Sequence, residues 1–245
     1  MKGEQMNTII EVNGLRKQYS NKVAVDGLSF QVNQGEVFGL LGHNGAGKST
    51  TINCILGLKS FEGGSATVLG MKAANSRKQL FERVGVQLQQ SCYQDRIKVE
   101  ELCQETAALY KDTADYQQLL EEFSLSEFKK QYVSTLSGGE KQKLSVLLAL
   151  ISKPEVIFLD ELTTGLDTAA RREVWKKLRE LKGRGVTILL TSHYMDEVEA
   201  LCDRICILQE GKEIVSGTVK EVIASSPYEC LEEAYLWYMG EEVEA

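Results

Sequence analysis

A glycine-rich segment that follows a short apolar stretch constrains this chain more than any other feature of its sequence. The segment, GHNGAGKS at 42–49, fits the pattern G-x-x-x-x-G-K-[ST]. The residues before it, VFGLL at 37–41, are typical of a strand buried in a parallel sheet. The residues after it, 48–58, are typical of a helix. A strand, a glycine-rich turn and a helix in this order are the context in which the pattern binds phosphate groups.

The residue types in this segment predict how phosphate would be held. Its glycines let backbone N–H groups point at phosphate oxygens with no side chain in the way, and the helix behind them adds its positive end. Lys48 can reach the terminal phosphates as a point charge, and the Ser49 hydroxyl can bind Mg²⁺. The predicted phosphate-binding residues are Gly42, Asn44, Gly45, Ala46, Gly47, Lys48, Ser49 and Thr50.

Two acidic residues end a second apolar stretch. Asp160 and Glu161 follow VIFL at 156–159, which is typical of a buried strand. Because ligands of open α/β sheets bind beyond the carboxyl ends of the strands, both carboxylates are expected near the phosphate-binding turn. Asp160 suits the Mg²⁺ shell, directly or through water, and Glu161 suits a base that polarises water for attack on a γ-phosphate. Acids at strand ends are commonly only solvated, so it is the glycine-rich turn that favours the catalytic interpretation.

A second glycine motif, LSGGE at 136–140, precedes a predicted helix at 139–151. A serine and two glycines at the start of a helix offer a hydroxyl, unobstructed N–H groups and a positive dipole end. The motif therefore resembles a second anion site. Since this loop contains no lysine, it cannot hold a triphosphate unaided.

Strand and helix patterns alternate in the second half of the chain. Strands are predicted at 155–159, 186–190 and 204–208, with helices at 168–181 and 195–201 between them. This alternation predicts an α/β fold with a right-handed, mostly parallel sheet covered by helices.

The other segments complete a single domain over 1–245. Short strands are predicted at 9–12, 15–19 and 23–32, with a turn at Asn13-Gly14, and helical periodicity at 99–128. We expect the core to occupy 1–90 and 151–217, and the helical insertion to occupy about 91–150. A C-terminal helical tail is expected at 218–245, with its last helix at 231–239.

Composition excludes several classes of protein. With 43% hydrophobic and 26% charged residues the chain is not intrinsically disordered. Its net charge of −7 opposes binding to a phosphate backbone, so nucleic acid is not an expected partner. The longest apolar run, 144–151, is shorter than the roughly 20 residues of a transmembrane helix. We expect a cytosolic chain without a signal peptide and with reduced thiols.

The motifs identify a resemblance through their order along the chain, which is GHNGAGKS at 42–49, LSGGE at 136–140, FLDE at 158–161, GLD at 165–167 and TSH at 191–193. In this order they resemble the nucleotide-binding subunit of ABC transporters, and the match covers essentially the whole chain. The resemblance implies the ABC ATPase fold: a P-loop NTPase core with a mostly parallel sheet, an N-terminal antiparallel β subdomain and an α-helical insertion. It also implies hydrolysis of ATP with Mg²⁺, although these residues alone leave GTP open.

In that family two subunits pair head to tail, so the resemblance implies a homodimer or pseudo-dimer. The P-loop of one subunit and the LSGGE segment of the other would enclose each nucleotide, with Ser137 and Gly139 against the γ-phosphate. Asp167 matches the segment that runs along the dimer seam. An anion site without a lysine is then explained, because the lysine comes from the other subunit.

The resemblance implies further roles around the nucleotide. Gln89, or Gln90 beside it, would touch Mg²⁺ and link the helical insertion to the core. His193 would bond the γ-phosphate and orient Glu161, while Tyr19 would stack on adenine. The implied catalytic residues are thus Glu161, His193 and Gln89, and the implied Mg²⁺ ligands are Ser49, Gln89 and Asp160.

Two residues depart from the family pattern. Leu162 stands where proline is usual, and Glu140 replaces the commoner glutamine. We expect Leu162 to alter only the stiffness of its turn, and the charge of Glu140 to be offset by Lys141 and Lys143. Neither departure removes a reacting group.

The family drives a membrane-embedded partner that docks between the core and the helical insertion. Because this chain has no predicted span, the permease would be a separate polypeptide, and the subunit would be cytoplasmic and peripheral on the inner face of the membrane. The segment LEEAYLWYMG at 231–240 resembles the ending of bacterial multidrug- and sodium-exporter ATPase subunits, which favours export. The residues do not identify the transported substrate.

Two alternatives stay open at this point. One is a soluble ABC ATPase, such as one that serves iron–sulfur assembly. The other is a nucleotide-gated binding module without hydrolysis, and the presence of both Glu161 and His193 argues against it.

Overall fold

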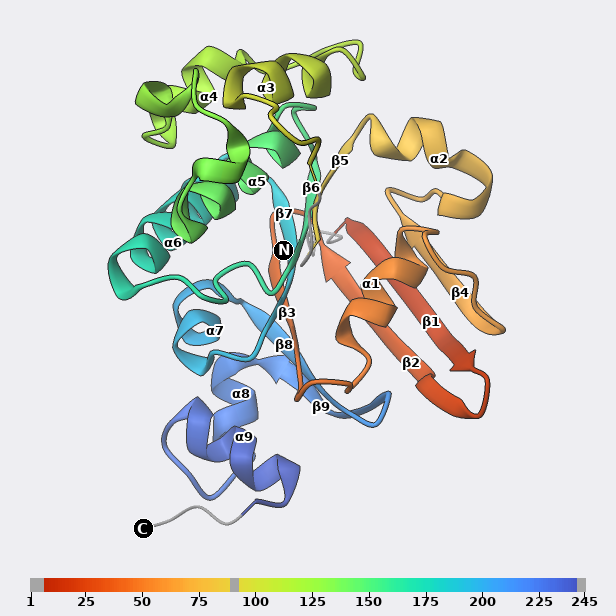
Figure 1. Ribbon diagram of the computed structural model, residues 1–245. Helices are drawn as coiled ribbons and strands as arrows, with labels where there is room; N and C mark the ends of the chain where they lie inside the picture. Colours follow the sequence, from red (N-terminus) through yellow and green to blue (C-terminus); the bar gives the residue numbers. More distant parts are fainter. Residues whose placement is uncertain (1–6, 89–92, 242–245) are drawn as a thin grey trace, which may run out of the picture.

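Two β-sheets frame the molecule (Figure 1). The computed structural model describes residues 7–88 and 93–241. One sheet is antiparallel, with strands in the order β2–β1–β4, and the other has six strands in the order β5–β6–β7–β3–β8–β9. In the six-stranded sheet every pairing is parallel except that of β8 with β9. The predicted fold class, a mostly parallel sheet with antiparallel N-terminal strands, is confirmed.

The bounds of the elements follow the chain order shown in Figure 1. The strands are β1 (Thr8–Tyr19), β2 (Lys22–Asn33), β3 (Val37–Leu41), β4 (Gly63–Val68), β5 (Val84–Gln87), β6 (Val156–Asp160), β7 (Thr187–Ser192), β8 (Arg204–Gln209) and β9 (Lys212–Thr218). The α-helices are α1 (Lys48–Ile55), α2 (Ala73–Phe81), α3 (Val99–Ala107), α4 (Tyr116–Glu122), α5 (Gly138–Leu150), α6 (Thr168–Gly183), α7 (Met195–Leu201), α8 (Val219–Ala224) and α9 (Leu231–Met239). Short 3-10 turns lie at 126–128 and 133–135.

The burial of the strands follows from their sequences. Every residue of β3, β6 and β7 is buried, as expected of apolar strands covered on both faces of a parallel sheet. In β1 and β2 buried and exposed residues largely alternate, so only one face of the antiparallel sheet packs on the core.

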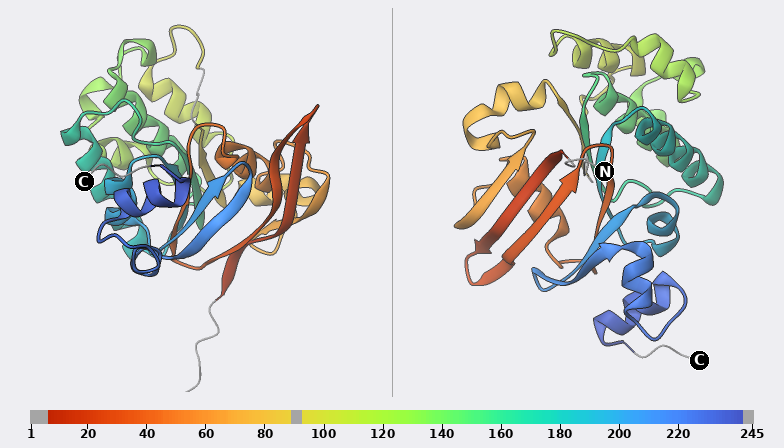
Figure 2. Two further views of the ribbon diagram at one scale, coloured as in Figure 1. Left: turned by 90° about the horizontal axis from the view of Figure 1, so that it is seen from below. Right: turned by 180° about the vertical axis from the view of Figure 1, so that it is seen from behind.

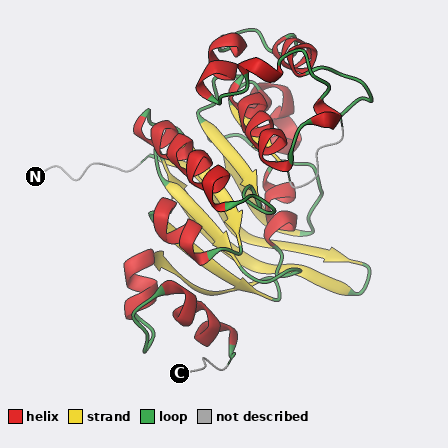
Figure 3. Cartoon of the chain, turned by 60° about the vertical axis from the view of Figure 1, so that its left-hand side comes forward, coloured by secondary structure: helices red, strands yellow, loops and turns green. Residues whose placement is uncertain are grey.

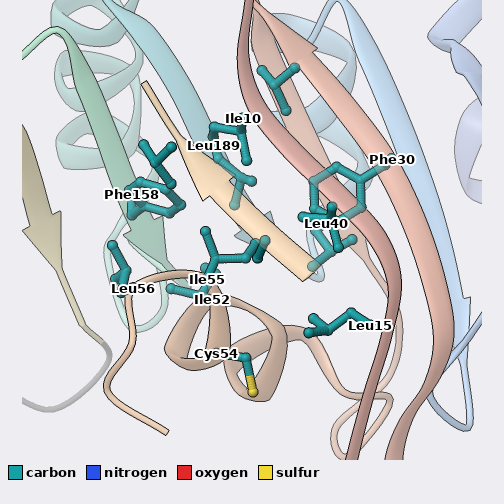
Figure 4. Close-up of a cluster of buried hydrophobic side chains, with 14 of the residues drawn as sticks. Ile10, Leu15, Phe30, Leu40, Ile52, Cys54, Ile55, Leu56, Phe158 and Leu189 are labelled. Atoms are coloured by element: carbon teal, nitrogen blue, oxygen red, sulfur yellow. The ribbon is translucent and has the colours of Figure 1, made fainter. Parts of the chain in front are cut away.

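Helix α1 packs between the two sheets. Figure 4 shows Ile52 and Ile55 of this helix in one cluster with Leu40 of β3, Phe158 of β6 and Ile10 of β1. All five side chains are at most 1% exposed. This packing holds the start of α1, and the turn that precedes it, at the carboxyl edge of β3.

Helices α5 and α6 cover the opposite face of the six-stranded sheet. Leu147 of α5 and Leu178 of α6 share a second buried cluster with Ile157 and Leu159 of β6. Viewed from behind, the antiparallel sheet and the helices α3–α6 lie on opposite sides of the six-stranded sheet (Figure 2). Helices α8 and α9 pack with α7 at the C-terminal end of the chain (Figure 3).

The N-terminal strands differ from their prediction. Two strands with a turn at Asn13-Gly14 were expected, but β1 runs unbroken through this dipeptide. Its register against β2 shifts between Val12 and Leu15, and the N–H of Gly14 donates to Ser29 Oγ at 2.8 Å. An Asn-Gly dipeptide often makes a hairpin turn, but in this strand it forms a bulge. The reason is that both β2 and β4 pair with β1 before and after the dipeptide.

Two helix predictions were also wrong in extent. The helix predicted at 48–58 ends at Ile55, since Gly57 takes a φ of 65° and stops it. The helical periodicity at 99–128 is divided between α3, α4 and a 3-10 turn. Asp115 starts α4 by accepting a hydrogen bond from the Gln117 N–H at 2.9 Å.

The cysteines of the described residues are all free. Burial raises the pKa of Cys54 to about 11 and that of Cys103 to about 12. Thiols with such pKa values stay protonated near neutral pH and react slowly. Their positions therefore suit packing.

We predict that Phe38→Ala destabilises the fold strongly. Phe38 of β3 is fully buried and stacks on Phe30 of β2, with ring centroids 5.1 Å apart, so it joins the two sheets. Loss of a buried phenyl ring should lower the free energy of unfolding by about 3–5 kcal/mol, measured by urea denaturation. Leu109, which is 76% exposed, provides the control, and Leu109→Ala should change that energy by less than about 0.5 kcal/mol. An unchanged urea midpoint for Phe38→Ala would contradict this view of the core.

Candidate functional site

The glycine-rich turn connects β3 to α1 and is held tightly by neighbouring strands. Gly42 has a φ of 149° and Gly47 a φ of 108°. A Cβ at Gly47 would lie 2.4 Å from the carbonyl oxygen of Ala24, and one at Gly42 would lie 2.5 Å from that of Leu208. Because these strand backbones approach so closely, only glycine fits at either position.

Lys48, the first residue of α1, carries a buried ammonium group. The residue is 4% exposed, and its Nζ donates to the carbonyl oxygens of Gly42 at 2.7 Å and His43 at 3.2 Å. Glu161 Oε1 lies 3.6 Å from the same nitrogen. Burial lowers the pKa of Lys48, and the nearby Glu161 and Asp160 counteract that effect. A desolvated cation at a helix start is suited to binding a phosphate oxygen.

Asp160 joins three parts of the sheet edge. It ends β6, where it pairs in register with Thr191 of β7. Its Oδ1 accepts from the Thr191 hydroxyl at 2.6 Å and from the Ser49 hydroxyl at 3.0 Å. The strand order brings β6, β7 and β3 together, so residues far apart in sequence meet at their carboxyl ends.

Glu161 leaves the strand in an unusual conformation. Its φ of 51° is left-handed, which costs an L-residue about 1–2 kcal/mol. The Glu161 N–H donates to the carbonyl oxygen and the hydroxyl of Thr191, at 3.2 and 3.0 Å. These bonds hold the reversed backbone, which turns the carboxylate back towards Lys48.

A cavity of about 380 Å³ lies over the glycine-rich turn. Its lining residues come from β1, β2, the turn, α1 and the end of β6, and they are Tyr19, Lys22, Ala24, Asn44, Gly45, Gly47, Lys48, Ser49, Thr50 and Glu161. Most of the predicted phosphate-binding residues thus meet in one cavity with Tyr19, which is 41% exposed. Gly42 and Ala46 do not line it. Instead, Gly42 accepts from Lys48, and Ala46 accepts from the Gly211 N–H at 3.0 Å.

The oxygens beside this cavity fit Mg²⁺. Ser49 Oγ and Asp160 Oδ1 are 3.0 Å apart, which matches the spacing of about 3 Å between adjacent ligands in an octahedron with bonds of about 2.1 Å. The described residues contain no cluster of three or more His, Cys, Asp or Glu side chains that could hold a metal alone. Mg²⁺ suits such a site because it usually binds one or two protein oxygens together with waters and substrate phosphates.

The LSGGE segment forms a separate element at the start of α5. The Ser137 hydroxyl accepts from the Glu140 N–H at 3.3 Å, and Glu140 Oε2 accepts from the Ser137 N–H at 2.7 Å, which together make a capping box. Neither Ser137 nor Gly139 lines the cavity over the glycine-rich turn. The structure gives the Glu140 carboxylate a local role as a helix cap.

The two lysines that follow Glu140 have other hydrogen-bond and ion-pair partners. Lys141 donates to the Ser134 carbonyl oxygen at 3.1 Å, and Lys143 pairs with Glu173. The other departure, Leu162, is 2% exposed and packs into the cluster under α5 and α6, so it anchors the loop after β6.

His193 and Asp167 lie on two further loops. His193 follows β7, is exposed and has its ring against that of Tyr194, with centroids 4.2 Å apart. It is not among the residues that line the cavity. Asp167 caps α6 by accepting from the N–H groups of Ala169 and Ala170. Gln89 and Gln90 lie outside the described residues.

Two residues of the site were missed by sequence reasoning. Thr191 bonds both Asp160 and Glu161, and Lys22 adds a cation to the cavity. Thr191 belongs to the TSH motif, but its role depends on the register of β7 against β6. Lys22 could have been found from its position three residues after Tyr19.

A buried lysine in a glycine-rich turn, next to an Asp-Glu pair at a strand end, defines a P-loop nucleotide hydrolase. Residues 25–164 match the family described as ABC transporter. The Nod factor export ATP-binding protein I of Burkholderia pseudomallei is 41% identical over 219 residues, covering 87% of this chain and 72% of that protein. The protein of the same description from Rhizobium etli is 40% identical over 225 residues, covering 88% and 70%.

Solved structures show the same fold. One described as the ATP-binding subunit of an ABC transporter has a TM-score of 0.87 and 28% identity, covering 95% of this chain and 100% of that one. An ATP-binding cassette of an ABC transporter in its ADP conformation has a TM-score of 0.79 and 25% identity, covering 94% and 98%. The chain belongs to the ABC transporter family, as an ATP-binding subunit that hydrolyses ATP. Family membership implies, in general terms, pairing with another such subunit and a partner in the membrane.

The structure adds one finding on the membrane question. Among residues 7–88 and 93–241, no helix combines the length and the apolar character that crossing a bilayer requires.

We predict that Lys48→Ala removes most of the affinity for ATP. In its predicted role the ammonium group would make a charge-assisted bond to phosphate, and such a bond contributes about 1.5–3 kcal/mol. Its loss should therefore weaken binding by at least about tenfold in calorimetry. Lys111→Ala, at an exposed lysine of the loop between α3 and α4, serves as the control and should bind normally. Equal affinity for the two variants would contradict the assignment of the cavity to phosphate.

A second prediction concerns Thr191→Val, which keeps the shape of the side chain and removes its hydroxyl. Asp160 and the Glu161 N–H each lose a buried partner, so the free energy of unfolding should fall by about 1–3 kcal/mol. The rate of ATP hydrolysis should fall as well, because Glu161 loses one of the bonds that set its backbone. Thr187→Val, at another buried threonine of β7, is the comparison and should leave the hydrolysis rate within about twofold of wild type. A normal hydrolysis rate for Thr191→Val would exclude a role for this hydroxyl.

Proposed function

We propose that the chain hydrolyses ATP on Mg²⁺ at the interface of a head-to-tail dimer and thereby drives export through a separate membrane permease. The single observation that carries the proposal is the meeting of Lys48, Ser49 and Glu161 in one cavity with Tyr19. These side chains supply a phosphate-binding cation, a metal-binding hydroxyl, a base and an aromatic surface for adenine.

Arrival of the triphosphate would release the base. Glu161 lies against the Lys48 ammonium group, with Oε1 3.6 Å from Nζ. A γ-phosphate oxygen is a stronger partner for Lys48, because it carries more charge and also meets the N–H groups of the turn. Glu161 is then available to accept a proton from an attacking water. Bound Mg²⁺, held by Ser49 and Asp160, would neutralise charge on the phosphates.

The second copy would complete the site. Ser137 caps α5 and Gly139 lies in its first turn; the N-terminal N–H groups of this 13-residue helix favour an anion. Because the Ser137 oxygen accepts a bond in its capping box, its hydroxyl proton can be donated to a phosphate. In the proposed dimer these groups meet the γ-phosphate bound to the other chain, and Asp167 lies along the seam.

Two further residues would contact the γ-phosphate and the metal. We assign His193 to a bond with the γ-phosphate that also orients Glu161, and Gln89 to Mg²⁺. The two residues follow β7 and β5, and both strands pair with β6, whose end carries Asp160. In this proposal the helical segment at about 91–150 moves with Gln89, so its position depends on whether nucleotide occupies the site.

The permease would dock beside this helical segment. A cavity of about 320 Å³ opens there between the end of β5 and the start of α5. Its lining includes Leu88 and Tyr93 next to polar residues such as Gln142. The subunit would then be peripheral on the cytoplasmic face of the membrane.

Export is supported by the relatives, which are described as Nod factor export ATP-binding proteins. The C-terminal segment that forms α9 agrees, since its sequence resembles the ending of exporter subunits. The same relatives do not favour the iron–sulfur alternative. The transported substrate is a property of the permease.

We predict that Glu161→Gln binds ATP but hydrolyses it at least about 100-fold more slowly, because the amide cannot accept the proton of the attacking water. The variant should accumulate as a dimer when Mg²⁺ and ATP are present, as measured by size-exclusion chromatography with light scattering. Hydrolysis at the wild-type rate would remove Glu161 from the reaction.

The matched variant adds Gly139→Asp to Glu161→Gln. A Cβ at Gly139 lies 3.5 Å from the nearest atom, the Cβ of Ala170, and an acid suits the first turn of a helix, so the fold should persist. The added carboxylate would repel the γ-phosphate of the other chain. We expect this double variant to bind ATP and remain monomeric. A dimer as stable as that of Glu161→Gln would refute the proposed interface.

A further inference from the structure

A buried carboxylate outside the nucleotide cavity holds the loop that carries His193. Glu197 of α7 is 1% exposed. Its carboxylate accepts from the Ser192 hydroxyl at 2.6 Å and from Trp175 Nε1 at 3.1 Å. Ser192 ends β7 directly before His193, and Trp175 lies on α6. The carboxylate therefore ties α6 to the residue that precedes the histidine.

The same serine fixes the backbone on the other side of His193. Its oxygen accepts from the Tyr194 N–H at 3.0 Å while its hydroxyl donates to Glu197. Both neighbours of His193 are thus joined through one hydroxyl group, and the Tyr194 ring packs on the histidine ring. The position of His193 depends on where Glu197 holds Ser192.

A second connection from α6 reaches the same loop one helical turn earlier. Arg171 donates from Nη1 to Asp196 at 3.1 Å, and its guanidinium carbon lies 4.2 Å from the centroid of the Tyr194 ring. Arg171 and Trp175 are four residues apart, so they lie on one face of α6. Asp167 caps the start of this helix. Helix α6 therefore bridges the Asp167 segment and the His193 loop.

Thr163 and Arg171 also act on the Glu197 carboxyl group. Burial raises the pKa of Glu197, and the bonds from Ser192 and Trp175, the Thr163 hydroxyl and the charge of Arg171 oppose this effect. Each of these groups favours the ionised carboxylate, which can accept from several donors at once.

The groups that act on Glu197 come from separate segments of the chain. Ser192 ends β7, Trp175 and Arg171 lie on α6, and Thr163 lies in the loop between Glu161 and α6. The carboxylate therefore connects the segment that follows Glu161 with α6 and with the His193 loop.

We propose that Glu197 is a positioning residue for ATP hydrolysis, which holds the His193 loop on α6 through its bonds to Ser192 and Trp175. The inference rests on the proposed role of His193. It adds a path within one chain that links the segment after Glu161, the start of α6 at the dimer seam, and the histidine.

The first test is kinetic and uses the full chain with Glu197→Gln. Glutamine keeps the volume, but its single acceptor oxygen cannot replace both carboxylate oxygens, of which Oε2 accepts from Ser192 and Oε1 accepts from Trp175. Because a misplacement of 1 Å can cost about 100-fold, we expect kcat for ATP to fall at least about tenfold. The KM for ATP should stay within about twofold, since no residue of the cavity changes.

Glu36→Gln is the matched control. Glu36 is also buried, and it accepts from the Asn33 N–H at 2.7 Å and from Arg204 at 3.2 Å, at the opposite end of β3 from the glycine-rich turn. A purely structural role of Glu197 would make both variants lose stability alike, with kcat unchanged at the temperature of assay. Wild-type kcat for Glu197→Gln therefore overturns the proposal.

The second test follows Trp175 directly. The chain has two tryptophans, so Trp237→Phe leaves Trp175 as the only one. In that background Mg²⁺ and ATP should shift the Trp175 emission, and Glu197→Gln should abolish the shift. If the Trp175 emission of the Trp237→Phe chain does not change with nucleotide, the proposed link from the His193 loop through Glu197 to α6 is overturned.

His193→Ala, measured alongside, separates this inference from the proposed function. If His193→Ala hydrolyses ATP at the wild-type rate, the assignment of His193 fails, and the inference with it. If His193→Ala is slow while Glu197→Gln is normal, only the positioning role of Glu197 fails.

Discussion

The buried ammonium group of Lys48 is the constraint on which the rest of the site depends. A lysine that is 4% exposed has lost most of its hydration, so acceptors must surround it. The carbonyl groups of the turn and the Glu161 carboxylate meet that need. They can do so because Gly42 and Gly47 let the backbone of the turn pass close to β8 and β2. In addition, only β7 separates β6, which ends at Asp160 before Glu161, from β3. The arrangement is suited to an anion that interacts with the Lys48 ammonium group more strongly than a carboxylate does.

The chemistry of the site was predictable from sequence where it is encoded locally. The apolar strand, the glycine turn and Lys48 are contiguous, as are Asp160 and Glu161, and the bounds of α7 and α9 agree with the expected helices at 195–201 and 231–239. The role of Thr191 was not predictable, because it exists only once β7 pairs with β6 in one register. Glu197 was hidden for a similar reason. It is one of three acids at 196–199, and only the fold shows that this one is buried against Ser192 and Trp175.

Local patterns also misled where neighbouring elements decided the outcome. Asn13-Gly14 is typical of a hairpin turn, yet pairing with β2 and β4 turns it into a bulge in one long strand. The charge of Glu140 suggested a need for lysine partners, but the carboxylate caps its own helix. Neither β4 nor α2 was predicted from the sequence. Strand β4 begins with two glycines, which weaken a strand pattern. Helix α2 is irregular, with non-helical dihedral angles at Ser76. At Asn13-Gly14 the tertiary environment outweighed the local preference.

The central claim is that one chain contributes the lysine and the base while a second chain contributes the serine–glycine corner. A structure of the full chain with Mg²⁺ and a non-hydrolysable ATP analogue tests it most directly, through the distance from Ser137 Oγ to the nearest γ-phosphate oxygen. The account predicts that this oxygen belongs to the nucleotide on the other copy, at a hydrogen-bond distance of about 2.7 Å. A nucleotide seated on Lys48 with Ser137 in solvent in every copy, and with monomers alone in solution, would contradict it.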